Sequence, residues 1–138
     1  MRKTLFAMAS LVLVLSAAGC SDLATGLGYS SVTGTYNLQT FNGASLPALF
    51  DQSSFQERDL LVETFAIYSD GTYTDDYRMR VSDQTGTSDL NYHDAGTYQQ
   101  NNTALQFRNS STGDVFTGSI TGNTLTITQF GDVYVFRR

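Results

Sequence analysis

Short stretches of alternating apolar and polar residues, separated by turn signals, run from residue 32 to the end of the chain. In the segment 124–129, for example, Leu125 and Ile127 alternate with threonines. Successive side chains of a β-strand point to opposite faces, so each such stretch has one face that needs a core. Tight hairpins require residues that tolerate positive φ. Four dipeptides of this kind mark hairpins, namely Asp70-Gly71, Asn101-Asn102, Gly122-Asn123 and Gly131-Asp132.

The strands predicted from this pattern number eight or nine, and helical periodicity is nearly absent. They cover residues 33–41, 60–69, 72–82, 88–93, 96–100, 103–108, 115–121, 124–129 and 133–137. This count predicts an all-β fold, a small antiparallel up-and-down barrel of about eight strands, with a β-sandwich as the alternative.

The triplet Gly-Thr-Tyr occurs at Gly34, Gly71 and Gly96. The unequal spacing argues against a regular repeat array. We interpret each triplet as the start of a strand, in which glycine ends a turn and threonine and tyrosine, both favoured in strands, follow it.

One connection, residues 42–59, is much longer than the hairpins. It carries four large apolar residues, and a long loop of this kind in a compact domain is a functional lid, a plug or a short helix. We favour a hydrophobic plug that closes one end of the barrel; a movable lid over a ligand cavity is the alternative. The four residues are Leu46, Leu49, Phe50 and Phe55.

Residues 1–19 have the pattern of an export signal. Arg2 and Lys3 precede an apolar stretch over residues 5–15, and small residues fill 16–19. The apolar stretch is shorter than the roughly 20 residues that a membrane-spanning helix needs. A signal peptide is therefore predicted.

The segment that ends the signal, Ala17-Ala18-Gly19-Cys20, resembles the lipobox of bacterial lipoproteins. The resemblance implies that Cys20 carries acyl chains such as palmitate and anchors the protein firmly. Residues 20–31 would form a flexible tether and residues 32–138 the barrel domain. Cys20 is the only cysteine, so it has no disulfide partner within the chain. In the lipoproteins that this segment resembles, a serine after the cysteine, here Ser21, implies sorting to the outer membrane, facing the periplasm.

A second resemblance covers the start of the domain. Gly34-Thr35-Tyr36-Asn37-Leu38, followed by the phrase from Phe41 to Pro47, resembles the opening of lipocalin-like bacterial domains; the Asn-Gly and Leu-Pro pairs resemble, less closely, META-type envelope lipoproteins. Lipocalin likeness implies an eight-stranded barrel, open at one end, that binds a small hydrophobic molecule.

These patterns lead to a non-enzymatic hypothesis, a lipid-tethered barrel that binds or carries a small apolar ligand. The alternative is a structural or protein-interaction module of the cell envelope with a solid core. Candidate ligand contacts are the apolar residues of the inward strand faces and the long loop: Tyr36, Leu38, Phe50, Tyr77, Met79, Phe107, Phe116 and Tyr134.

Other function classes find little support in the composition. Without residues 1–19 the chain has six arginines, no lysine and 13 acidic residues. This net negative charge repels the phosphates of nucleic acid. His93 is the only histidine, no Gly-x-Ser-x-Gly motif is present, and Asp70, Asp75 and Asp76 lack calcium-loop spacing, so neither an enzyme, a metal site nor a cofactor is expected.

Two acidic residues alternate in step with apolar residues and are therefore predicted on the same strand face as them. Asp75 alternates in step with Tyr77 and Met79, and Glu63 with Phe65. If these faces are interior, both acids are buried at a cost unless an arginine or a ligand cation pairs with them. A strand bulge would remove this cost by turning Leu60, Val62, Ala66 and Tyr68 inward instead.

Overall fold

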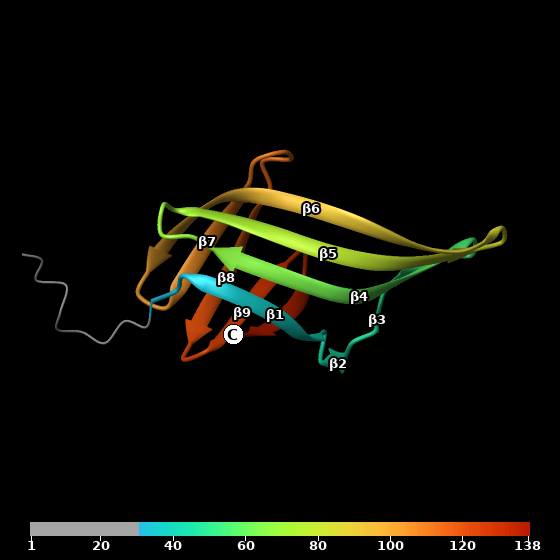
Figure 1. Cartoon of the computed structure of the whole chain (residues 1–138), viewed down its shortest axis with the longest axis horizontal. Helices are drawn as coiled ribbons and strands as arrows, with labels where there is room; N and C mark the ends of the chain where they lie inside the picture. The colour runs from blue at the N-terminus through green and yellow to red at the C-terminus, as the bar shows by residue number, and fades with distance from the viewer. Residues whose placement is uncertain (1–30) are drawn as a thin grey trace, which may run out of the picture.

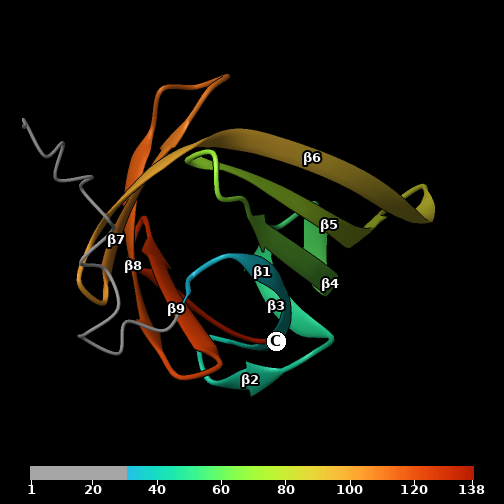
Figure 2. The ribbon, with the colours of Figure 1, turned by 60° about the vertical axis from the view of Figure 1, so that its left-hand side comes forward.

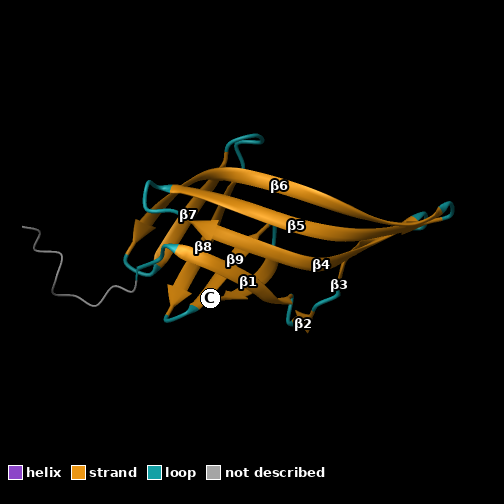
Figure 3. Ribbon diagram, viewed as in Figure 1, coloured by secondary structure: helices purple, strands orange, loops and turns teal. Residues whose placement is uncertain are grey.

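The computed structural model describes residues 31–138, so the predicted signal peptide, Cys20 and nearly all of the tether lie outside the described residues. This part of the chain is all-β, with no helix (Figures 1 and 3). Accordingly, it holds no helix long and apolar enough to cross a membrane. The strands are β1 (Gly34–Phe41), β2 (Ala44–Ser45), β3 (Ala48–Gln52), β4 (Gln56–Ile67), β5 (Thr72–Asp83), β6 (Gly86–Asn101), β7 (Ala104–Asn109), β8 (Val115–Thr121), β9 (Thr124–Gln129) and β10 (Asp132–Arg137).

Eight of these strands form a closed antiparallel barrel. From β4 to β10 each strand pairs with its neighbour in the chain, and β1 closes the ring by pairing with both β10 and β4 (Figure 2). The short strands β2 and β3 lie outside the ring, on β1 and β4. The predicted up-and-down barrel of about eight strands is therefore confirmed, and the sandwich alternative is wrong.

The prediction of separate strands at 88–93 and 96–100 is wrong, because both belong to the 16-residue strand β6. Gly96 lies where β6 leaves β5 and joins β7, and it pairs with Tyr73 on one side and Asn109 on the other. A Cβ atom at Gly96 would lie 2.0 Å from the carbonyl oxygen of Arg108. The third Gly-Thr-Tyr triplet thus marks a bend within a strand, whereas Gly34 begins β1 and Gly71 precedes β5.

Aromatic side chains fill the barrel at the end where β1 begins. The ring of Phe65 stacks on Tyr73 at 4.9 Å between centroids and meets Phe107 edge-on at 5.2 Å. Phe107 in turn stacks on Phe116 at 5.0 Å. Six residues predicted as ligand contacts belong to the buried core cluster, namely Tyr36, Leu38, Met79, Phe107, Phe116 and Tyr134. This half of the interior is a packed core.

The long connection contains β2 and β3 in place of a structureless loop, and β4 begins early, at Gln56. Leu46 and Phe50 pack against the core, but Leu49 is 52% exposed and Phe55 is 72% exposed. Only two of its four large apolar side chains are therefore sheltered.

The two ends of the described chain meet beside Tyr36. The buried Tyr36 hydroxyl donates a hydrogen bond to the carbonyl oxygen of Val32 at 2.7 Å. Arg138 Nη1 donates to the carbonyl oxygens of Ser31 and Thr33 at 2.8 and 2.9 Å, and its guanidinium lies 5.5 Å from the Tyr36 ring centroid. These contacts fix the segment before β1 against the barrel.

A Tyr36→Phe substitution should lower the free energy of unfolding by about 1 kcal/mol, because it leaves the buried Val32 carbonyl without its donor. Urea denaturation followed by circular dichroism measures the change. Tyr68→Phe is the matched control, since Tyr68 is 46% exposed, and its loss should stay below about 0.5 kcal/mol. Equal losses for the two variants would contradict the buried hydrogen bond.

Candidate ligand-binding site

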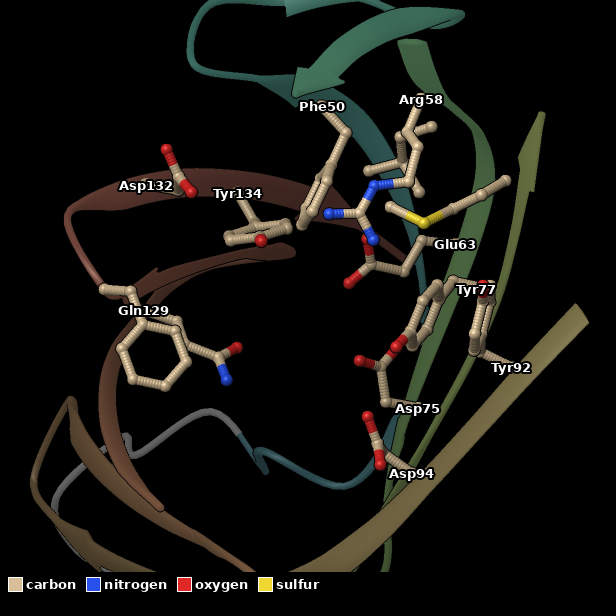
Figure 4. A pocket seen from close by; sticks show the side chains of 13 residues that line it. Phe50, Arg58, Glu63, Asp75, Tyr77, Tyr92, Asp94, Gln129, Asp132 and Tyr134 are labelled. Atoms are coloured by element: carbon tan, nitrogen blue, oxygen red, sulfur yellow. The ribbon is translucent and has the colours of Figure 1, made fainter. Parts of the chain in front are cut away.

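A cavity of about 240 Å³ lies in the other half of the barrel, toward the end that holds β3 and the β9–β10 turn. It is partly enclosed, and Figure 4 shows side chains from both sides of the ring converging on it. Its walls come from β3 to β6 and from β9 and β10. The lining residues are Phe50, Arg58, Leu60, Glu63, Asp75, Tyr77, Met79, Tyr92, Asp94, Gln129, Phe130, Asp132 and Tyr134.

The structure divides the eight predicted ligand contacts into two groups. Phe50, Tyr77, Met79 and Tyr134 line the cavity together. Tyr36, Leu38, Phe107 and Phe116 are buried in the core and do not line the cavity, whereas Met79 and Tyr134 belong to both the core cluster and the lining. Cys20, the predicted lipidation site, lies outside the described residues. The assignment of these eight residues as ligand contacts remains a prediction.

A bulge in β4 brings Glu63 into the cavity. The pairing with β5 shifts register between Leu60 and Val62, so Leu60 and Glu63 both face inward although simple alternation would place them on opposite faces. Glu63 is only 5% exposed. Glu63 and Phe65 therefore share the interior, the first of the two predicted possibilities. The bulge of the alternative is also present and turns Leu60 inward, but Val62 and Tyr68 are exposed.

Asp75 on β5 completes an acidic pair with Glu63. Asp75 is paired in register with Phe65 on β4 and with Asp94 on β6, while Glu63 is paired with Tyr77, so the two carboxyls are diagonal neighbours on one face. One carboxyl, when protonated, can donate a hydrogen bond to the other. Asp75 Oδ1 is fully buried and has no hydrogen-bond partner.

Burial keeps this pair protonated well above the ordinary range of carboxylic acids. Burial, and then the negative charge of Asp75 and the hydrogen bond with it, raise the pKa of Glu63 well above its usual value. Burial, and then the charges of Asp94 and Asp76, raise the pKa of Asp75 to about 7. Two neighbouring buried carboxyls retain a shared proton, because ionisation of both together is strongly disfavoured.

Arg58 lines the cavity but is paired elsewhere. Arg58 Nε donates to Asp51 Oδ1 at 2.7 Å, and the guanidinium lies 5.6 Å from the Phe50 ring centroid. Among residues 31–138 the remaining ion pairs are Arg80 with Asp89 and His93 with Asp76. No described side chain forms an ion pair with Glu63 or Asp75.

Aromatic rings form two walls around the acids. Tyr77 and Tyr92 stack at 5.0 Å between centroids with an interplanar angle of 12°. Phe50 and Tyr134 both pack on Phe41, at 5.4 and 5.0 Å. Burial raises the pKa of Tyr77 to about 12, so its hydroxyl is protonated at neutral pH and can donate a hydrogen bond.

Several cavity residues were missed by sequence reasoning. Tyr92 and Asp94 continue the inward phase of β6 and could have been found had that strand been predicted whole. Arg58, Gln129 and Asp132 carry no local signal, because they reach the cavity only through ring closure and the β9–β10 turn.

Among residues 31–138, His93 and the acidic residues outside the cavity do not form a second candidate site. His93 Nδ1 lies 2.6 Å from Asp76 Oδ1, and both side chains are 61% exposed. Within the described part of the chain, no three His, Cys, Asp or Glu side chains gather as a metal site.

The chain matches no protein-family model and no curated protein sequence. A barrel of this shape is compatible with ligand binding.

Proposed function

We propose that this chain is a small-molecule-binding β-barrel of a bacterial cell envelope, tethered through a lipid on Cys20. The observation that carries the binding proposal is a barrel filled with aromatic side chains in one half and hollow in the other, where aromatic rings surround a cavity of about 240 Å³. The lipid tether and the envelope location are supported by the export signal and lipobox resemblance alone.

The cavity volume limits the size of the ligand. Sites for drug-sized molecules have volumes of about 300 to 1,000 Å³. A cavity of about 240 Å³ suits a smaller body, such as a single aromatic ring with a short substituent. The rings of Phe50, Tyr77, Tyr92 and Tyr134 provide apolar contact for such a body.

Native mass spectrometry of the full-length protein, expressed with its own signal and extracted from membranes in mild detergent, tests this proposal. We expect an acyl mass on Cys20 and a small non-covalent mass. Gln129→Trp should abolish the non-covalent mass, because Gln129 is a partly buried lining residue at a turn and an indole there would occupy the cavity. Gln106→Trp, on the exposed face of β7, is the matched control and should retain it.

A wild-type protein with an empty cavity, or equal retention of the small mass in both variants, would count against ligand binding.

The rival function, a protein-interaction module, is favoured by Phe55 and Phe130, which are 72% and 82% exposed. An empty cavity together with a defined protein crosslinked at Phe130 in intact cells would favour that rival.

A further inference from the structure

We infer that the ligand of this cavity is an organic cation, an amine or ammonium group on a small aromatic or apolar body, whose positive charge is bound by Glu63 and Asp75. This inference rests on the proposed function, because it names the chemical class of the molecule for the same cavity.

The burial of Glu63 and of one carboxylate oxygen of Asp75, without a cation, carries the inference. Glu63 is 5% exposed, and Asp75 Oδ1 is buried with no hydrogen-bond partner. A buried carboxyl is costly unless it is paired, and a buried polar atom without a partner costs free energy as well. Arg58, the cation that lines the same cavity, is paired with Asp51. A ligand ammonium would supply positive charge and hydrogen-bond donors where no described side chain forms an ion pair.

The surrounding walls suit a cation better than the other ligand classes. Aromatic faces attract cations through their negative quadrupole, and Tyr77 and Tyr92 present a stacked pair beside the acids (Figure 4). An anion would be repelled, because Asp94 and Asp132 also line the cavity. A wholly apolar molecule would leave Asp75 Oδ1 without a partner. A metal ion is disfavoured, since the described residues bring no three suitable ligands together.

Binding of such a cation should release protons from the protein. In the free protein one of the two carboxyls, when protonated, can donate a hydrogen bond to the other. A bound ammonium stabilises both carboxylates, so the carboxylic protons pass to the buffer while the ligand keeps its own. The other titratable groups that face the pair are Arg58 on β4, Tyr73 and Tyr77 on β5, Tyr92 and Asp94 on β6, and Asp132 and Tyr134 on β10.

Three probes of nearly equal size and different charge test the inference by titration calorimetry with the full-length protein near pH 6. The probes are phenethylamine, 2-phenylethanol and phenylacetate. Phenethylamine should bind at least about tenfold more tightly than 2-phenylethanol, and phenylacetate should bind most weakly. The heat of amine binding should depend on the ionisation heat of the buffer in the sense of proton release, with about one to two protons released per amine, because both carboxyls hold protons near pH 6.

Glu63→Gln and Asp75→Asn should each weaken phenethylamine binding about tenfold or more and leave 2-phenylethanol binding nearly unchanged. Both variants keep the side-chain shape and remove a buried ionisable group, so the fold should persist. Asp59→Asn, on the same strand as Glu63 but away from the cavity lining, is the matched control and should bind phenethylamine like the wild type.

The inference is overturned if 2-phenylethanol binds as tightly as phenethylamine, if the two acid variants leave amine binding unchanged, or if none of the three probes binds. Binding of the alcohol without the amine would still leave the proposed function standing. If none of the three probes binds and native mass spectrometry also finds an empty cavity, both the inference and the proposed function are contradicted.

Discussion

Gly96→Ala is expected to lower the free energy of unfolding by about 3 kcal/mol or more, which is large for a single methyl group. The added Cβ would lie 2.0 Å from the Arg108 carbonyl oxygen and 2.6 Å from Tyr73 Cε1. The oxygen belongs to the backbone of β7 and cannot rotate away, so β6 and β7 must separate at the point where the barrel turns. Urea denaturation monitored by circular dichroism measures the loss.

Ala95→Gly, at the neighbouring position of the same bend, is the control for this substitution. Removing that methyl should cost at most about 1 kcal/mol, the usual penalty for glycine in a strand. If Gly96→Ala remained within about 1 kcal/mol of the wild type, the close passage of β6 beside β7 would be contradicted.

Raising the pH from about 5 to about 8 is expected to lower the free energy of unfolding by on the order of 3 kcal/mol. The pKa of Glu63 and the pKa of Asp75 are raised in the folded protein, so the folded state holds protons more tightly than the unfolded state. The stabilisation is fully present below about pH 4, where both states are protonated, and is lost as the pH rises through the folded pKa, which is about 7 for Asp75. Urea midpoints across a pH series measure this slope.

The double variant Glu63→Gln/Asp75→Asn should show a much flatter dependence on pH over the same range. His93 contributes in the same direction, because its hydrogen bond with Asp76 raises the pKa of the imidazole. His93 is exposed, so His93→Gln should keep most of the slope. A slope that vanished in His93→Gln and persisted in the double variant would assign the effect to the surface pair instead.

Local chemistry was sufficient to predict most of the strands. The bounds of β8 and β9 agree with the prediction, because turn residues and alternation mark both ends of each. Strand β6 was divided because Gly96 looked like the end of a turn. In the structure this glycine permits close passage between two strands, which is a tertiary contact and leaves no distinct pattern in the sequence.

The candidate site was only partly predictable, for a related reason. Alternation shows which side chains face the interior but not how far along the barrel they lie. Phe107 and Tyr77 therefore looked equivalent, although Phe107 belongs to the packed half and Tyr77 to the cavity. The phase of Glu63 and Asp75 was informative because acids on an inward face are rare. The β4 bulge that brings Leu60 to the same face could not be located from the sequence.

The direction in which the chain enters the barrel bears on where a ligand would come from. Residue 31 leads into β1 at the end of the barrel opposite to β3 (Figure 1). The cavity lies toward the end that holds β3. If Cys20 carries an acyl anchor, the attachment point would therefore be at the packed end, and the mouth of the cavity would lie at the end of the barrel away from it. Entry of a ligand at that mouth would then leave the tethered end of the barrel undisturbed.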